Sequence, residues 1–209
     1  MVRIPMSGRR ARLVIFAKAP HMGRAKTRLA ADIGPVEAQR FYRDQVAKTV
    51  RRLAADAPWQ TILAVTPDHT IDPIRRIFPD VTGLALIPQG RGNLGARMQS
   101  VFDRLPPGPV IIVGTDCPEL KASHVAQAFK ELGNQPVVFG PAADGGYYLI
   151  GQRRSPAVLR LFEGVRWSSA YTLDDTLANM PFGTRAARLE TLADVDTGAD
   201  YKAYLRRVG

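Results

Sequence analysis

Residues 109–120 of this chain, P-V-I-I-V-G-T-D-C-P-E-L, join a short apolar run to an acidic turn. The uninterrupted apolar run 110–113 predicts a strand buried on both faces, as strands are in the parallel sheets of α/β proteins. Asp116 lies on the turn directly after this strand. Ligands of open α/β sheets bind outside the carboxyl ends of the strands, so we expect Asp116 to lie in a ligand site.

Strand and helix patterns alternate through the first 140 residues, which predicts a mainly parallel sheet covered by helices. The predicted strands are 12–17, 60–66, 84–88, 110–113, 136–140, 147–150 and 186–189. The predicted helices are 35–55, 71–78, 92–104, 123–132, 156–162, 170–178 and 199–207. A tight glycine turn precedes strand 147–150, so this strand is expected to pair antiparallel. The expected fold is a three-layer α/β/α arrangement with a mixed, mainly parallel central sheet.

Length and composition indicate a single globular domain. The 209 residues are 45% hydrophobic and 23% charged, and we expect one domain over residues 11–209 that follows a basic tail at 1–10. No apolar run approaches the roughly 20 residues of a membrane-spanning helix, and the run 13–17 is too short for the core of a signal peptide. A cytoplasmic enzyme or binding protein is therefore expected.

The chain carries a formal net charge of +10, from 29 Lys and Arg against 19 Asp and Glu. Such a charge is typical of nucleic-acid binders. Here, however, the paired arginines at 51–52, 75–76, 153–154 and 206–207 are scattered and are not interleaved with aromatic residues that would stack on bases. A basic enzyme that attracts phosphorylated small molecules is favoured over a nucleic-acid partner.

A basic loop, residues 18–28, follows the first predicted strand and reads K-A-P-H-M-G-R-A-K-T-R. It is not a P-loop, because that motif needs Gly-Lys-Ser/Thr in succession. Its glycine lets the backbone approach a ligand, and its cations are charge-assisted donors to phosphate. The loop is predicted to bind the phosphates of a nucleotide, the alternative being a solvated basic loop. The predicted binding residues are Lys18, Gly23, Arg24, Lys26 and Arg28.

A second glycine-rich segment, residues 88–98, follows the third predicted strand and reads P-Q-G-R-G-N-L-G-A-R-M. Gln89 and Asn93 carry amides that are able to read the edge of a nucleobase, and Arg97 is a candidate phosphate ligand. The alternative is an ordinary glycine turn in which Asn93 lies near a helix cap.

Three acidic turns lie at or near the ends of predicted strands. Mg²⁺ is usually held by one or two carboxylates together with phosphate oxygens. Asp116 and Asp196 are the predicted metal ligands, although Asp196 is also placed to cap helix 199–207. Asp144 begins D-G-G-Y, where Gly145 and Gly146 suggest close approach of the backbone to a ligand. Asp144 is predicted to bind the hydroxyls of an acceptor or to act as a base.

Three further residues adjoin these turns. Tyr147 and Trp167 are predicted to line the acceptor pocket, although Trp167 is equally suited to anchoring the segment 163–175. Cys117 is the single cysteine of the chain, and no neighbouring histidine suggests an activating base. A small packing residue in a tight turn is the favoured interpretation of Cys117.

Taken together, these motifs resemble a bacterial family of small GT-A-type transferases, whose members are often labelled glycosyltransferases and include an arsenosugar-biosynthesis group. The segments that carry the resemblance are 16–29, 89–98, 114–120, 141–147 and 194–197, within the range 13–201. The resemblance implies the nucleotide-diphospho-sugar transferase fold. The same fold serves the molybdenum cofactor guanylyltransferases and 2-phospho-L-lactate guanylyltransferase.

The resemblance also implies roles for individual residues. Lys18, Lys26 and Arg28 would contact the nucleotide phosphates. Asp116 would hold Mg²⁺ or Mn²⁺, and Asp144 would serve the acceptor or the metal side. The usual D-x-D of glycosyltransferases is here G-T-D, with one carboxylate.

Two reactions therefore stay open. One is glycosyl transfer from a nucleoside-diphosphate sugar to a small acceptor. The other is nucleotidyl transfer from a nucleoside triphosphate to a phosphorylated acceptor. A protein that binds nucleotide or nucleic acid without catalysis is a third alternative. The sequence does not identify the base, the sugar, the acceptor or the oligomeric state.

Overall fold

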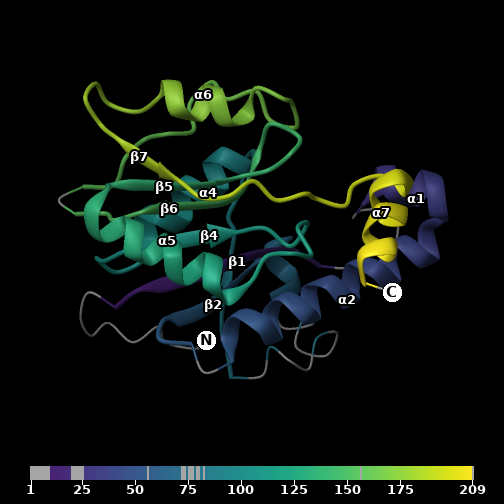
Figure 1. Ribbon diagram of the computed structural model, residues 1–209. Helices are drawn as coiled ribbons and strands as arrows, with labels where there is room; N and C mark the ends of the chain where they lie inside the picture. The colour runs from purple at the N-terminus through teal and green to yellow at the C-terminus, as the bar shows by residue number, and fades with distance from the viewer. Residues whose placement is uncertain are drawn as a thin grey trace.

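A computed structural model describes residues 10–19, 26–55, 57–71, 74, 78, 81, 83–155 and 157–208. A seven-stranded sheet with the order β3-β2-β1-β4-β6-β5-β7 lies between layers of helices (Figure 1). The strands are β1 (Arg12–Lys18), β2 (Gln60–Thr66), β3 (Ala85–Pro88), β4 (Val110–Val113), β5 (Val137–Pro141), β6 (Tyr147–Gln152) and β7 (Ala186–Arg188). The predicted three-layer α/β fold is confirmed.

The pairing of the strands places the carboxyl ends of every strand except β6 at one edge. β3, β2, β1 and β4 are parallel neighbours, β7 runs parallel to β5, and β6 is antiparallel to both β4 and β5. The predicted antiparallel strand is thus confirmed. The chain passes from β1 to β2 on one side and returns to β4 on the other side of β1. Such a switch point leaves a crevice at the carboxyl ends of β1 and β4.

The helices are α1 (Thr27–Ile33), α2 (Pro35–Ala54), α4 (Leu94–Arg104), α5 (Ala122–Asn134), α6 (Thr172–Ala178) and α7 (Gly198–Val208), with a 3₁₀ turn η1 (Asp68–Thr70). α2 and α5 pack on one face of the sheet, and α4 and α6 pack on the other (Figure 1). None of the described helices is both long and apolar enough to cross a membrane. The predicted helix 71–78 and the predicted tail 1–10 lie largely outside the described residues.

Side chains of β1 alternate between the two cores, as the twofold period of a strand requires. Leu13 and Ile15 belong to the core beneath α2 and α5. Val14 and Phe16 belong to the core beneath α4 and α6. A strand covered on both faces must be apolar at nearly every position, and that is why the short apolar runs of this sequence are central strands.

The predicted helix 156–162 is wrong, because the described residues 157–162 form no helix. The Gln152 side chain at the end of β6 binds the backbone of Leu159 in this segment. Its Oε1 accepts from the Leu159 amide at 2.8 Å, and its Nε2 donates to the Leu159 carbonyl at 3.3 Å. Leu161 and Phe162 are buried against the sheet. Apolar contacts and one glutamine therefore replace the helical hydrogen bonds.

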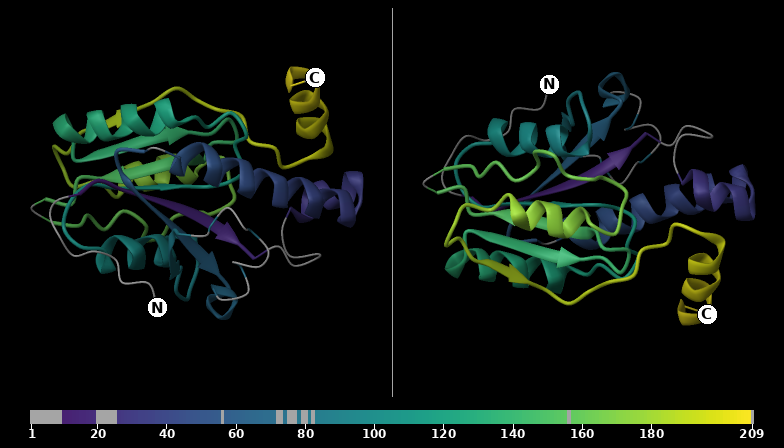
Figure 2. Two further views of the ribbon diagram at one scale, coloured as in Figure 1. Left: turned by 90° about the horizontal axis from the view of Figure 1, so that it is seen from below. Right: turned by 90° about the horizontal axis from the view of Figure 1, so that it is seen from above.

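A small lobe of α1, α7 and the start of α2 extends beyond the sheet (Figures 1 and 2). Its centre is Phe41, whose ring lies edge-on to Tyr201 and Tyr204 with centroids 5.1 and 5.8 Å away. Asp32 of α1 accepts from the Gly198 amide of α7 at 2.6 Å. This lobe turns the chain so that residues 194–197 run past the end of β4.

Phe41 is expected to support this lobe. The substitution Phe41→Ala removes both ring contacts and should lower the free energy of unfolding by about 3 kcal/mol. Urea denaturation followed by circular dichroism measures the loss. Val36 lies on the same helix and is 67% exposed, so Val36→Ala is the matched control and should change stability by no more than about 0.5 kcal/mol. Equal effects of the two substitutions would contradict the assignment.

Candidate active site

A cavity of about 760 Å³ opens at the switch point between β1 and β4. Its walls come from the end of β1, the start of α1, α4, the turn after β4, the turn 142–146 and the segment 167–170. Most of the predicted site residues meet here although they are distant in the sequence. Those that line the cavity are Lys18, Lys26, Arg28, Gln89, Arg97, Asp116, Asp144, Tyr147, Trp167 and Asp196.

Lys26 is the centre of the polar part of the cavity. Its Nζ lies 2.6 Å from Asp116 Oδ1 and 2.6 Å from Asp196 Oδ1, and it donates to the Val195 carbonyl at 2.7 Å. The Lys26 side chain is 5% exposed, whereas those of Asp116 and Asp196 are 55% and 36% exposed. Burial by itself lowers the pKa of Lys26, but the two carboxylates outweigh burial and raise it above its ordinary value. The group is therefore a buried ammonium with two anionic partners.

The backbone at Lys26 is left-handed, with φ 54°, directly before α1. A residue with a side chain pays about 1–2 kcal/mol for this conformation. Three short contacts of the ammonium help to offset that cost. The local strain and the ion pairs thus belong to one arrangement that directs Lys26 inward.

The structure shows that Asp196 is not the cap of α7, which was one of its two predicted roles. α7 is capped by Thr197 and Asp200, because Asp200 Oδ2 accepts from the Thr197 amide at 2.8 Å and Thr197 Oγ1 accepts from the Asp200 amide at 3.3 Å. This reciprocal pair resembles a capping box. The Asp196 carboxylate does not cap the helix and instead faces Lys26 and Asp116.

Asp116 and Asp196 are the residues best placed to hold a divalent cation. Both reach one point in space, and Mg²⁺ characteristically binds one or two carboxylates plus phosphate oxygens. Within the described part of the chain, no group of three or more histidine, cysteine, aspartate or glutamate side chains forms a cation site by itself. The donor set therefore suits a cation whose remaining ligands come from a bound phosphate.

Tyr42 of α2 fixes the end of β1 at the cavity, a role that the sequence reasoning missed. Its hydroxyl accepts from the Lys18 amide at 2.8 Å and donates to the Lys18 carbonyl at 3.0 Å. Burial raises the pKa of Tyr42, so the hydroxyl stays neutral. The Lys18 side chain is left exposed at the cavity wall. The only hint in the sequence was a polar-tipped tyrosine on the apolar face of the predicted helix 35–55.

Gln89 is not free to read a nucleobase. Its side chain is 3% exposed, and Nε2 donates to the carbonyls of Ala17 at 3.1 Å and Ala64 at 3.0 Å. Its Oε1 accepts from Arg97 Nη1 at 3.1 Å. Both amide hydrogens are thus used at the ends of β1 and β2, and the role that the structure gives Gln89 is to orient Arg97 in the cavity.

Asn93 is the N-cap of α4 and does not line the cavity. Its Oδ1 accepts from the Ala96 amide at 2.9 Å, which satisfies one of the free amides of the first turn. The helix-cap alternative therefore describes Asn93 better than the nucleobase prediction. Gly23 and Arg24, the other predicted phosphate ligands of the basic loop, lie outside the described residues.

The turn 142–146 presents Asp144 to the cavity. Asp144 Oδ1 accepts from the Gly146 amide at 2.8 Å, which fixes the carboxylate. Gly145 has φ 86°, and a Cβ at that position would overlap the backbone of Ala170. Neither glycine lines the cavity, so their role is to shape the turn and to pack it against segment 168–171, in contrast to the predicted contact with an acceptor.

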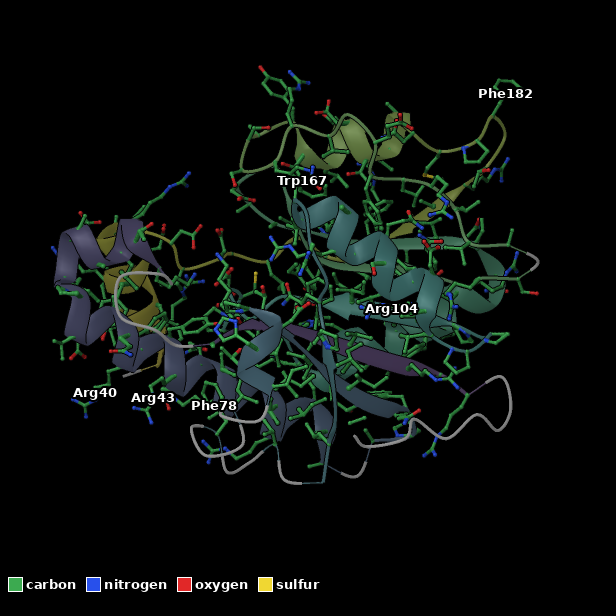
Figure 3. All side chains as sticks on the ribbon, turned by 180° about the vertical axis from the view of Figure 1, so that it is seen from behind. Arg40, Arg43, Phe78, Arg104, Trp167 and Phe182 are labelled. Atoms are coloured by element: carbon green, nitrogen blue, oxygen red, sulfur yellow. The ribbon has the colours of Figure 1, made fainter. Side chains whose placement is uncertain are left out.

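Trp167 lies at the cavity and also packs within the fold. It lines the cavity and lies against the N-terminal end of α4 (Figure 3), where a Cβ on Gly95 would overlap its ring. Its centroid is 6.3 Å from that of Phe162. The buried Nε1 of Trp167 has no hydrogen-bond acceptor among the described residues. Tyr147 lines the same side of the cavity.

Two residues beside the site complete its electrostatics. Burial, and then the charges of Asp144 and Asp196, raise the pKa of Asp194 to about 6. The sequence analysis did not include this residue in the site. Burial raises the pKa of the Cys117 thiol, which makes the thiol a poor nucleophile and agrees with a packing role.

A comparison with protein-family models gives one match, described as "Uncharacterized protein conserved in bacteria (DUF2064)", over residues 49–169. The match spans more than half of the chain. The protein belongs to the DUF2064 family. The matched range includes Asp116 and Asp144 and leaves Lys26 and Asp196 outside. None of the curated proteins compared with the chain matches it.

Solved structures confirm the fold that the resemblance implied. The "putative nucleotide-diphospho-sugar transferase" of Desulfovibrio desulfuricans G20 is 28% identical, with a TM-score of 0.84 over 94% of this chain and 87% of that one. CMP:2-keto-3-deoxy-manno-octonic acid synthetase, solved with CTP, is 16% identical, with a TM-score of 0.56 over 95% and 98% of the two chains. Glucosyl-3-phosphoglycerate synthase of Mycobacterium tuberculosis, solved with Mn²⁺, UDP and glucosyl-3-phosphoglycerate, is 12% identical, with a TM-score of 0.56 over 96% of this chain and 77% of that one.

These similarities place this DUF2064 protein in the nucleotide-diphospho-sugar transferase fold. Sugar transferases and nucleotidyltransferases share this fold. The last two similarities lie below 25% identity and concern the fold alone. The choice of reaction therefore rests on the cavity of this chain.

Gly95 is expected to be required for the position of Trp167. The substitution Gly95→Ala should lower stability by about 1–3 kcal/mol through overlap with the indole ring, and it should shift the tryptophan fluorescence. Gly133→Ala is the matched control, because a Cβ there meets nothing within 4 Å in α5. The control should be neutral or slightly stabilising. An unchanged spectrum for Gly95→Ala would contradict the contact.

Proposed function

We propose that this DUF2064 protein is a metal-dependent transferase that takes a nucleotide-activated donor, and that it moves a sugar from a nucleoside-diphosphate sugar to a small acceptor. The proposal is carried by one observation: two convergent carboxylates, Asp116 and Asp196, share a cavity with cationic side chains from β1, α1 and α4. A cavity of about 760 Å³ falls in the size range of small-molecule sites. The D. desulfuricans G20 protein supports the donor class by its description.

The donor diphosphate would bind along the cationic wall. Lys18 and Arg28 line the cavity and have no ion-pair partner among the described residues, and Arg97 is oriented by Gln89. These three cations would neutralise the negative charge that grows on the diphosphate as the bond to the sugar breaks. Asp116 and Asp196 would hold Mg²⁺ or Mn²⁺, which supplies further positive charge to the leaving diphosphate when bound.

Asp144 would serve the acceptor. One of its oxygens accepts from the Gly146 amide, which leaves the other able to accept a hydrogen bond from an acceptor hydroxyl. In a reaction that inverts the sugar carbon, Asp144 would take the proton of that hydroxyl as general base. In a retaining reaction it would orient the hydroxyl.

The acceptor side of the cavity favours glycosyl transfer over nucleotidyl transfer. Trp167, Ser169 and Tyr147 line this side. The neighbouring cation Arg166 is bound by both oxygens of Asp175, at 2.9 and 2.7 Å, and its guanidinium carbon lies 4.2 Å from the centre of the Tyr171 ring. The described acceptor side thus offers aromatic rings and the Asp144 carboxylate, which suit a neutral hydroxyl acceptor better than a phosphorylated one.

Donor binding can be tested without knowledge of the acceptor. Nucleoside diphosphates and their sugars should raise the melting temperature in the presence of Mn²⁺, since ligand at 100 times its dissociation constant adds about 2.7 kcal/mol to stability. Asp116→Asn should abolish the metal-dependent part of this shift. Asp103→Asn is the control, because Asp103 pairs with Arg160 outside the cavity. A full shift in Asp116→Asn would refute the metal assignment.

The leaving group distinguishes glycosyl transfer from nucleotidyl transfer. Incubation with sugar nucleotides, with water as the default acceptor, should slowly release nucleoside diphosphate, which ³¹P NMR detects. Asp144→Ala should reduce this release by about 10²-fold or more if the carboxylate acts as general base. Nucleoside triphosphates should release no pyrophosphate when mixed with phosphorylated hydroxy acids. Pyrophosphate release with one triphosphate would replace the proposal by nucleotidyl transfer.

A further inference from the structure

The Lys26 ammonium lies at the point where Asp116 and Asp196 converge, 2.6 Å from an oxygen of each. A divalent cation bound by the same two oxygens would lie about 2.0–2.6 Å from each of them. The two positions overlap almost completely. Because two positive charges cannot share one small volume, the Lys26 ammonium and a divalent cation are alternative occupants of this point.

Lys26 cannot leave this point without a cost. Its side chain is 5% exposed and its ammonium has three acceptors here, the two carboxylates and the Val195 carbonyl. Moved away from them, the ammonium would need another anion, because an unpaired charge in a partly buried site is unfavourable. Lysine has a flexible four-carbon stem that lets its head move between partners. A donor diphosphate in the same cavity would be such an anion.

We propose that Lys26 is an exchangeable internal counter-ion. It holds Asp116 and Asp196 together before substrate binds, releases them to the divalent cation, and transfers its ammonium to the donor phosphate. This inference rests on the metal-dependent part of the proposed function and adds to it a positioning role for Lys26. It implies that cation alone binds weakly, and that donor and cation strengthen each other's binding by the same factor.

Two other roles for Lys26 make different predictions. A static clamp would hold Asp196 in place for the cation, so that removal of Lys26 would weaken binding of the cation. A lysine that only contacts phosphate would leave binding of the cation alone unchanged. Of the three roles, only the exchange role predicts that removal of Lys26 strengthens binding of the cation in the absence of nucleotide. The reason is that a competitor is removed and two carboxylates are freed.

The test is the affinity for Mn²⁺ alone, measured by electron paramagnetic resonance of free Mn²⁺ without any nucleotide. Lys26→Met should bind Mn²⁺ about tenfold more tightly than the wild type, within the usual range of coupling between sites. Lys18→Met is the matched control, since it removes the same charge from the same cavity wall without freeing a carboxylate. Its Mn²⁺ affinity should rise by less than about threefold through the weaker long-range effect.

A second measurement, the melting temperature, tests the effect of Lys26 on stability. Without a cation, Lys26→Met leaves Asp116 and Asp196 uncompensated, so its melting temperature should be lower than that of the wild type, and Mn²⁺ should raise it by a larger increment. Lys26→Gln keeps a hydrogen-bond donor without the charge and replaces Lys26→Met if the latter does not fold. Circular dichroism without Mn²⁺ reports whether each variant is folded.

The outcomes separate this inference from the proposed function. Equal or weaker Mn²⁺ affinity in Lys26→Met and Lys26→Gln, with normal binding by the wild type, would overturn the exchange alone. An equal gain in Lys18→Met would reduce the effect to general electrostatics and would also overturn it. If no form binds Mn²⁺, with or without UDP, GDP or CDP, the metal-dependent function itself fails.

Discussion

The ion pairs of Lys26 with Asp116 and Asp196 join three segments that are far apart in the chain: the residue before α1, the turn after β4 and the segment before α7. A backbone hydrogen bond from Val195 to the Asp116 carbonyl, at 3.0 Å, lies beside them. Two carboxylates brought this close repel each other unless a cation lies between them. The polar half of the cavity therefore depends on a positive charge at one point, whichever group supplies it.

Other polar groups are held by backbone carbonyls in place of counter-ions. The fully buried Arg12 donates through one nitrogen to the carbonyls of Arg10, Pro106 and Pro107, and Arg154 donates to those of Leu105 and Pro106. Gln89 ties the carbonyls of β1 and β2 in the same way. Arg12 and Arg154 thus hold the loop before β4 at the edge of the sheet opposite the cavity. Gln89 braces the cavity itself, where Lys18 and Arg28 are exposed cations that a ligand can reach.

The two halves of the cavity carry different amounts of information about function. The cationic half and the carboxylate pair suit any donor with a diphosphate, which agrees with a fold that serves both sugar and nucleotidyl transfer. The acceptor half is more specific, because Arg166 is bound to Asp175 and the turn 142–146 offers the Asp144 carboxylate. The contrast between the two halves is the physical basis for preferring a hydroxyl acceptor.

The sequence by itself determined the seven strands, most of the helices, the fold family and the turns that carry Asp116, Asp144 and Asp196, but it missed α1 and wrongly predicted a helix at 156–162. Apolar runs buried on both faces and glycine turns are local signals, and the carboxyl ends of parallel strands must meet at one edge. The hydrogen-bond and ion-pair partners of the polar side chains were decided only by the tertiary structure. Gln89 and Lys26 were predicted to contact a ligand, yet Gln89 binds backbone carbonyls and Lys26 binds two carboxylates. Residues 157–162 form no helix, and there the Gln152 side chain binds the backbone of Leu159. A side chain's polar groups bind whichever partner folding brings within about 3 Å, and spacing along the chain does not encode that distance.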